Sequence, residues 1–236
     1  MKSEEIGVRS EEEPAPAHAL PHSSPLTPHP SPLIRRLGLA DYAPTYAAMR
    51  RFTETRGPGT ADELWLLQHP PVYTAGVAGR PEHFPREGSI PLERVDRGGQ
   101  ITYHGPGQAI VYALLDLARR GLTVRALVRL LEQAAIDCLA AYNVDAARRP
   151  GAPGVYVDGA KVAALGLRVR RGGCYHGIAL NVDMDLAPFS AIDPCGYPGL
   201  AVTQTRALGI RADVEAMGEA LARRIAELIE NENVDR

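Results

Sequence analysis

The sequence predicts an α+β fold, in which a mixed β-sheet is flanked by helices. Two observations support this fold class. Seven apolar runs have the length and composition of strands, and three longer segments repeat apolar residues at helical spacing. Strand and helix patterns do not alternate strictly along the chain, as they would in a parallel α/β fold, so we expect a mixed sheet.

Three segments are predicted to be helices. The first, Asp41 to Arg56, places its aromatic residues and a methionine on one stripe, and Gly57-Pro58-Gly59 ends the pattern. The other two run from Thr123 to about Tyr142 and from Asp213 to about Glu230. Each of these two begins with a residue whose side chain can cap a helix N-terminus, and each is amphipathic.

The predicted strands are short apolar runs bounded by turn residues. Glycine and proline mark the boundaries, and residues 76–90 are rich enough in both to predict a loop. The strands are expected at Glu63–Gln68, Val72–Thr74, Arg94–Asp96, Ala109–Leu117, Gly154–Val157, Lys161–Arg170 and His176–Val182.

The first 32 residues have the composition of a disordered tail. Residues 14–32 hold seven of the 20 prolines and three of the seven histidines, and five glutamates precede them. Such a segment buries too little apolar surface to offset the loss of chain entropy. We therefore expect a disordered Pro/His-rich tail over 1–32 and one folded domain over 33–236.

Composition argues against several classes of protein. The 236 residues carry a formal net charge of −2, which gives no basic field for a general nucleic-acid binder. No apolar run approaches the roughly 18 residues of a membrane span, and the N-terminal residues lack the apolar core of a secretory signal. Three cysteines do not make a disulfide scaffold, so we expect reduced thiols and a cytoplasmic protein.

Lysine is rare in this chain, and one lysine stands out. Of the 26 lysine and arginine residues, only Lys2 and Lys161 are lysines, and Lys2 lies in the predicted tail. A compositional drift toward arginine does not explain why Lys161 is retained. Lysine, unlike arginine, can lose its proton when it is desolvated. Lys161 opens a nearly apolar strand, so it is either functional or reaches solvent along its aliphatic stem.

A glycine-rich segment, RGGQITYHGPGQ, extends from Arg97 to Gln108. Its four glycines permit positive φ angles and a close approach of the backbone to another group. The segment lacks both the phosphate-loop motif and the dinucleotide-binding fingerprint. It is therefore either a ligand-binding loop or an ordinary bulged hairpin.

Two cysteines are candidate nucleophiles. Cys195 lies between Pro194 and Gly196, which predict an accessible loop, and Cys174 lies two residues before His176. The residues alone do not choose between the two cysteines, nor do they require that either reacts. Cys138 fits a small buried side chain in a helix. A Cys-x-His pair supplies too few ligands for zinc, so no metal site is predicted.

Three blocks of sequence occur in order with compatible spacing: RGGQITYHGPGQ, GVYVDGAKVAALGLRVRRGGCYHGIALNVDMDL and IDPCG. On these blocks the chain, from about Leu33 onward, resembles the octanoyltransferases of lipoate biosynthesis, the lipoyl(octanoyl) transferases. The resemblance implies a biotin/lipoate protein ligase-like catalytic domain over 33–236. Many members carry Thr-Ser-Leu after the cysteine, where this chain has Val202-Thr203-Gln204-Thr205.

The resemblance also implies an activity and its residues. An octanoyl group would pass from octanoyl-acyl carrier protein to a lysine of a lipoyl domain, the first step of endogenous protein lipoylation. Cys195 would carry the acyl group as a thioester and Lys161 would be its acid/base partner, which decides against Cys174. The implied substrate-binding residues are Arg97, Gly98, Gly99, Gln100, Ile101, Thr102, Tyr103, His104, Ala164, Leu165, Gly166, Gly177, Ile178 and Ala179.

The implied acceptors are the lipoyl domains of 2-oxoacid dehydrogenases and the glycine cleavage H protein. The reaction needs no cofactor and no metal, and no nucleic acid or membrane takes part. Two other functions compete with this one. An ATP-dependent lipoate or biotin-type protein ligase would use the same fold, and a non-catalytic protein would only bind acyl carriers or lipoyl domains.

Further expectations concern the surroundings of the site. The octanoyl chain is expected in a groove lined by Val162–Gly166 and Tyr103. His104 and His176 either orient the site or are satisfied structural histidines. A set of arginines forms either a basic rim that docks an acidic carrier protein or a solvated charged face. These are Arg148, Arg149, Arg168, Arg170 and Arg171.

Overall fold

The computed structural model describes residues 30–85, 88–197 and 199–232. Its elements are β1 (Leu33–Leu39), α1 (Tyr42–Thr55), β2 (Glu63–Gln68), β3 (Val72–Ala75), η1 (Pro81–His83), β4 (Leu92–Arg94), β5 (Ile101–His104), β6 (Gln108–Leu114), α2 (Leu117–Arg120), α3 (Val124–Ala140), β7 (Ala147–Arg148), β8 (Val155–Val157), β9 (Ala160–Arg170), β10 (Gly173–Asn181), η2 (Ala187–Ala191), η3 (Pro194–Gly196) and α4 (Val214–Asn231).

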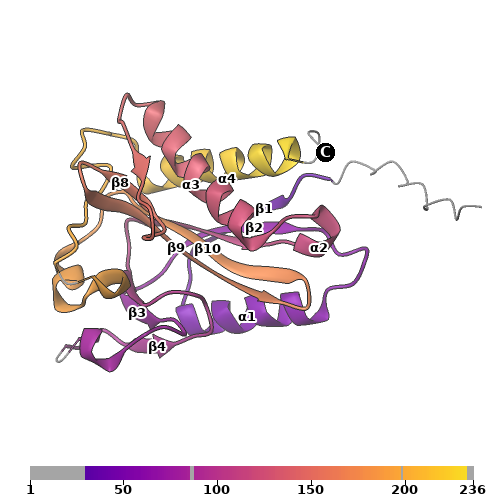
Figure 1. Ribbon diagram of the computed structural model, residues 1–236, viewed down its shortest axis with the longest axis horizontal. Coiled ribbons are helices and arrows are strands. Elements are labelled where there is room, and N and C mark those ends of the chain that lie inside the picture. Colours follow the sequence, from indigo (N-terminus) through magenta and orange to yellow (C-terminus); the bar gives the residue numbers. More distant parts are fainter. Residues whose placement is uncertain (1–29, 86–87, 198, 233–236) are drawn as a thin grey trace, which may run out of the picture.

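Seven strands form the main sheet, in the order β1-β2-β6-β10-β9-β8-β7, and β4-β3-β5 form a smaller sheet. The pairing of β1 with β2 is parallel, and the other pairings in the main sheet are antiparallel. Helices cover both faces of the main sheet, as Figure 1 shows. The predicted α+β fold with a mixed sheet is therefore confirmed.

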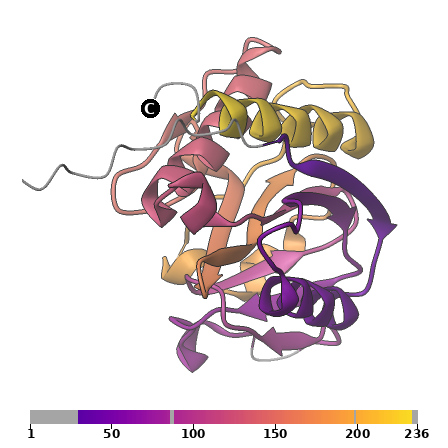
Figure 2. The same ribbon diagram turned by 90° about the vertical axis from the view of Figure 1, so that its right-hand side faces the viewer.

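The alternation of side chains along the central strands divides the core into two layers. Leu64 and Leu66 of β2 face α3 and α4, whereas Trp65 and Leu67 face Met49 of α1. The strand β6 divides in the same way. Figure 2 shows α4 and α1 on opposite sides of the sheet. The two amphipathic helices predicted after Thr123 and Asp213 thus share one face, and both caps form hydrogen bonds to the helix backbone.

Three strands were not predicted from the sequence: β1, β5 and the two-residue β7. The edge strand β1 has side chains that are exposed along most of its length, so it carries no apolar pattern. The strand β5 occupies the glycine-rich segment, where it pairs with β3. The three predicted helices are confirmed to within two residues at each end.

The predicted tail lies largely outside the described residues, which begin at Pro30. Regular structure starts at Leu33. Within the described part of the chain, no helix has the length and apolar character needed to cross a bilayer.

A buried carboxylate ties three parts of the chain together. The side chain of Asp62 is fully buried and pairs with Arg56, Arg119 and Arg120. Its Oδ1 also accepts a hydrogen bond of 2.8 Å from the backbone N–H of Asp116. Burial by itself raises the pKa of Asp62, but the charge of Arg120 and the hydrogen bonds lower it below its ordinary value. The carboxylate is therefore charged at neutral pH and holds the start of β2 against α2.

We expect Asp62→Asn to lower the free energy of unfolding by about 3–5 kcal/mol, because it leaves buried arginine charge without its partner. Urea unfolding measures this change. The matched control is Asp145→Asn, at an exposed position without an ion pair among the described residues, where the change should stay within about 0.5 kcal/mol. Equal changes in the two variants would contradict this role of Asp62.

Candidate active site

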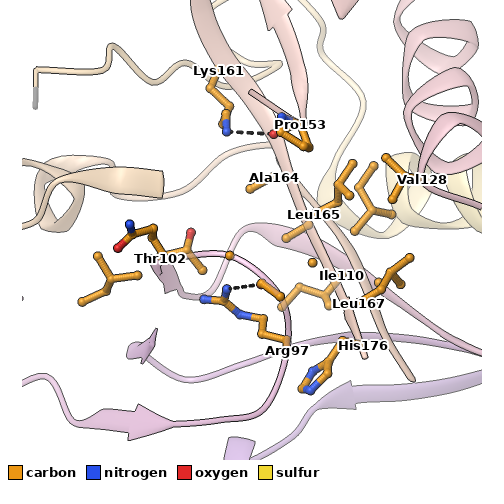
Figure 3. A pocket seen from close by; sticks show the side chains of 18 of the residues that line it. Arg97, Thr102, Ile110, Val128, Pro153, Lys161, Ala164, Leu165, Leu167 and His176 are labelled. Carbon is orange, nitrogen blue, oxygen red and sulfur yellow. Dashed lines mark hydrogen bonds between the residues drawn. The ribbon is translucent and has the colours of Figure 1, made fainter. Parts of the chain in front are cut away.

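A cavity of about 350 Å³ lies where β9, β10, α3 and the segment before β5 meet. Figure 3 shows Lys161 and Pro153 at one end of it and Arg97 and His176 at the other. Several residues of its lining are exposed, among them Val124 at 44% and Tyr197 at 42%, together with Gly99, Gly151 and Pro153. The residues around His176 are almost completely buried. The cavity therefore has a mouth near α3 and a closed floor near His176.

Small residues on neighbouring strands make room for this cavity. Ala164 of β9 pairs with Ala179 of β10, and both line the cavity. Leu165 and Ile178 form the next pair along the two strands and also contribute to the lining. Mostly apolar side chains thus surround the middle of the cavity, as an aliphatic ligand requires.

Two glycines of the predicted site allow neighbouring backbone segments to pack closely. A Cβ atom on Gly177 would lie 2.0 Å from the carbonyl oxygen of Val111, so β10 approaches β6 only with glycine at this position. A Cβ on Gly166 would lie 2.8 Å from the carbonyl oxygen of Gly98. Glycine at 166 therefore allows the segment before β5 to lie directly against β9.

The segment Arg97–Gln100 closes one side of the cavity. The N–H of Gly98 donates to the carbonyl oxygen of Leu167 at 2.9 Å, which joins this segment to β9. The buried Arg97 guanidinium donates to the carbonyl oxygen and to the hydroxyl of Thr74, at 2.6 and 2.9 Å. Arg97 and the three residues after it all line the cavity.

Lys161 is 3% exposed and lines the cavity. Its Nζ donates to the carbonyl oxygen of Pro153 at 3.0 Å and lies 5.1 Å from the centre of the Tyr156 ring. The sequence allowed a lysine that reaches solvent along its aliphatic stem. The structure excludes this alternative, because the side chain is buried. A carbonyl oxygen and an aromatic face thus hold its Nζ in place.

The turn that carries Cys195 is anchored beside Lys161. After η3, the chain returns alongside β9, where Lys161 N–H donates to Ala201 and Thr203 N–H donates to Lys161. On the other side of the turn, the side chain of Gln100 packs against Gly196. Gln100 and Tyr197 both line the cavity. The backbone of Cys195 thus lies between residues of the cavity wall.

Before η3, a second anchor holds the turn. Asp193 Oδ2 lies 2.8 Å from His83 Nδ1, and the N–H of Asp193 donates to the carbonyl oxygen of His83. The segment after the turn is held as well, because Asn181 Nδ2 donates to the carbonyl oxygen of Thr203. This segment, Val202 to Thr205, is the stretch that departs from the family pattern.

Most of the residues predicted to bind substrate come together at this cavity. Two predictions fail among the described side chains: Tyr103 does not reach the cavity, and the expected acyl groove is shorter than Val162–Gly166. Tyr103 packs against Tyr73 and Phe189 below the small sheet and does not line the cavity. Val162 and Ala163 belong to the core on the α3 side. The predicted groove along Val162–Gly166 therefore narrows to Ala164, Leu165 and Gly166.

Cys174, the rival nucleophile, lies in the core away from the cavity. It is fully buried, and its Sγ donates to the carbonyl oxygen of Ala113 at 3.2 Å. Burial raises the pKa of this thiol to about 12. Cys138 is likewise buried, and burial raises its pKa to about 11. Neither thiol has the access or the acidity that a nucleophile needs.

A network of aromatic and charged side chains forms the closed floor. The carboxylate of Asp96 accepts hydrogen bonds from Tyr46 and Tyr175 at 2.9 and 2.5 Å, and His176 Nε2 lies 3.5 Å from it. Burial by itself raises the pKa of Asp96, but hydrogen bonds from His176, Tyr175 and Tyr46 bring it well below its ordinary range. Asp96 is therefore a fixed anion beneath the cavity.

The backbone at His176 allows this floor to form. Its φ is 64°, in the left-handed region, so its side chain does not alternate with that of Tyr175 across the sheet. Both rings contact Asp96, and the His176 ring stacks on Tyr46 at 5.5 Å. Strained backbone of this kind is maintained where the surroundings fix it. The sequence analysis did not identify Asp96 as a residue of the site, and it did not predict the positive φ of His176.

The histidines of the floor are neutral at pH 7. Burial lowers the pKa of His104 to about 3, and the nearby His69 and Arg97 lower it as well, against a hydrogen bond to Gln108 that raises it. Burial also lowers the pKa values of His69 and His176. His104 Nδ1 lies 2.7 Å from Gln108 Oε1, and its ring lines the cavity.

This burial makes stability depend on pH. The pKa of His104 is lower in the folded chain than the roughly 6.5 of an unfolded histidine. The contribution of neutral His104 to the free energy of unfolding is therefore fully present above pH 6.5. It is lost as the pH falls, by about 2 kcal/mol at pH 5. We expect His104→Gln to reduce the loss of unfolding free energy between pH 7 and pH 5 by about this amount. Urea unfolding at both pH values checks it, and an unchanged pH dependence in the variant would contradict it.

Comparison with known proteins adds to this geometry. Residues 41–226 match the family described as the lipoyl protein ligase A/B catalytic domain. An octanoyltransferase from Aromatoleum aromaticum is 62% identical over 200 residues, which cover 85% of this chain and 87% of that protein. Among solved structures, lipoate-protein ligase A bound with ATP has a TM-score of 0.70 at 16% identity, covering 84% of this chain and 85% of that chain. Biotin protein ligase from Aquifex aeolicus has a TM-score of 0.52 at 13% identity, covering 85% and 70%.

The two structural likenesses lie below 20% identity, so they show the fold alone. They confirm the predicted biotin/lipoate protein ligase-like architecture. The family match and the close relative together confirm the resemblance drawn from the three sequence blocks. The chain therefore belongs to the octanoyltransferases of lipoate biosynthesis, within the lipoyl protein ligase A/B family, and it is an acyltransferase.

Proposed function

We propose that this protein transfers an octanoyl group from acyl carrier protein to a lysine of a lipoyl domain, through a thioester on Cys195 with Lys161 as the acid/base residue. One observation supports this proposal most. A mostly apolar cavity ends beside a buried lysine and beside the turn that carries Cys195. The relatives of this chain are named octanoyltransferases, which supports the same substrate.

The cavity suits an eight-carbon chain. Its middle is lined by Ala164, Leu165, Ile178 and Ala179, with Val128 on the side of α3. At about 0.8 kcal/mol per buried carbon, burial of the six methylenes and the methyl group contributes at most about 6 kcal/mol.

The chemistry needs a nucleophile that also leaves well. In the first step, the Cys195 thiolate attacks the carbonyl carbon of the donor thioester, and the carrier thiolate leaves and takes up a proton. In the second step, the amine of the acceptor lysine attacks the enzyme thioester, loses a proton and displaces the Cys195 thiolate. An amide forms and a thioester breaks, with no change in oxidation state.

Lys161 is proposed to hold and move the proton in both steps. Neutral Lys161 accepts the thiol proton of Cys195 and returns it to the departing carrier thiol, and it then accepts the proton of the incoming amine. Arginine at this position would supply charge but would not exchange a proton.

The thioester intermediate is tested by intact-protein mass spectrometry after mixing with octanoyl-acyl carrier protein. We expect a single octanoyl adduct that hydroxylamine removes. Cys195→Ser should lack this adduct, whereas Cys174→Ser, which changes the buried thiol, should retain it. Loss of the adduct in Cys174→Ser with its retention in Cys195→Ser would overturn the assignment of the nucleophile.

The acid/base role is tested by Lys161→Arg. We expect transfer to the lipoyl domain to fall by about 10²–10⁴-fold, the usual contribution of a positioned proton donor and acceptor. Thermal unfolding of the same variant checks that the fold is retained. Turnover within a few-fold of the original chain, in a folded variant, would refute the proton-transfer role of Lys161.

A further inference from the structure

The mouth of the cavity lies beside the first turns of α3. This helix carries an apolar stripe and a positively charged stripe side by side. Val124 and Val128 line the cavity, whereas Arg125 and Arg129, each one residue further along, line a groove beside it. Successive residues of a helix lie about 100° apart, so the arginine stripe runs directly next to the mouth. The groove is bounded on its other side by the end of α4, at Leu228 and Asn231.

Two more arginines complete this surface. Arg148 lines the same groove, and its guanidinium donates to the carbonyl oxygen of Arg129 at 2.9 Å. Arg149 follows it, and Gly151 to Pro153, which begin two residues after Arg149, line the cavity. All four arginines are exposed. We call Arg125, Arg129, Arg148 and Arg149 the mouth arginines.

The positive charge of this surface is only partly neutralised. Arg148 pairs with Glu132 at 3.1 Å, and the carboxylate of Glu132 also accepts from the N–H of Gly154. Arg125, Arg129 and Arg149 form no ion pair with any carboxylate of the described residues. Glu232 also lines the groove, but it forms no ion pair with these arginines in the described part of the chain. The surface beside the mouth therefore keeps an excess of positive charge, which attracts an anionic partner.

The other arginines of the predicted rim lie elsewhere in the fold. Arg170 pairs with Glu54 of α1 at 2.7 Å, and Arg168 lies 4.0 Å from Asp96. Arg171 follows the last residue of β9, ten residues after Lys161. At about 3.3 Å per residue, the two lie about 30 Å apart along the strand. The charge at the mouth therefore comes from α3 and from residues 148–149.

We propose that the mouth arginines are the docking surface for the acidic face of the acyl carrier protein that delivers the octanoyl group. This inference rests on the proposed function. The carrier must remain outside while its acyl chain enters the cavity, so the carrier's surface has to contact the rim. The exposed Val124 and Tyr197 supply apolar contact at the same rim. Positive rim charge raises the rate of encounter with an anionic partner, by about 10–10³-fold in known cases.

The experiment compares two octanoyl thioesters as donors. One is octanoyl-acyl carrier protein, and the other is octanoyl-N-acetylcysteamine, a small uncharged thioester that needs no protein contact. The rate of acyl-enzyme formation is measured by mass spectrometry for the original chain and for the double variant Arg125→Glu/Arg129→Glu. Arg211→Glu is the matched control, because Arg211 is exposed and precedes α4, about 25 Å from the residues of α4 that line the groove.

We expect kcat/KM with the carrier-borne donor to fall at least tenfold in the double variant, mainly through KM. The small thioester should react within twofold of the original rate, and Arg211→Glu should behave like the original chain with both donors. The neutral double variant Arg125→Gln/Arg129→Gln should show a smaller loss in the same direction. High salt should reduce all of these differences.

Three results separate the possible failures. An unchanged KM for the carrier in the folded double variant would overturn the docking proposal. A slower transfer to the lipoyl domain with normal acylation by the carrier would also overturn it, since the surface would then belong to the acceptor. Absence of acyl-enzyme from both donors in the original chain would instead overturn the proposed function.

Discussion

The cavity exists because β8 ends much earlier than its neighbour β9. β8 has three residues and β9 has eleven, so β8 pairs with β9 only as far as Ala163. Beyond this point the segment before β5 takes the place of β8, with Gly98 bound to Leu167. Backbone groups at a buried sheet edge need partners, and a loop satisfies some of them while leaving space that a strand would fill. Lys161 lies where the β8 pairing is still intact, which fixes it at the edge of this space.

The closed end of the cavity has a different physical basis from its middle. Ala164 and Ala179 leave room, whereas Asp96, His176 and their tyrosine partners form a polar network. Such a network is stable only if its members are paired, and the unusual φ at His176 brings two consecutive side chains to the same carboxylate. The floor is therefore rigid and uncharged apart from Asp96 and Arg97. In the proposed function, the donor arm and the acceptor lysine enter from the opposite end.

The sequence predicted the fold class, the three long helices and most central strands, because these follow from apolar periodicity. It did not predict β1 and β7, whose side chains are mostly exposed, or β5, whose glycine neighbours resemble a loop. At the site, the retained Lys161 pointed to a special environment, and its burial agrees with this reading. Tyr103 was predicted from the family resemblance and Arg168 from its place near other arginines in the sequence, but strand pairing puts both on other surfaces. Arg125 escaped notice because an exposed helix arginine has no distinctive pattern.

The fold is shared with ATP-using ligases, so the identity of the acyl donor is the central claim of this account. The most direct measurement is octanoylation of a purified lipoyl domain under two conditions. One mixture contains octanoyl-acyl carrier protein without ATP, and the other contains free octanoate with ATP and Mg²⁺. The account predicts product in the first mixture and none in the second. Product only in the second mixture would contradict it, because the cavity would then serve an activated free acid and not a carrier thioester.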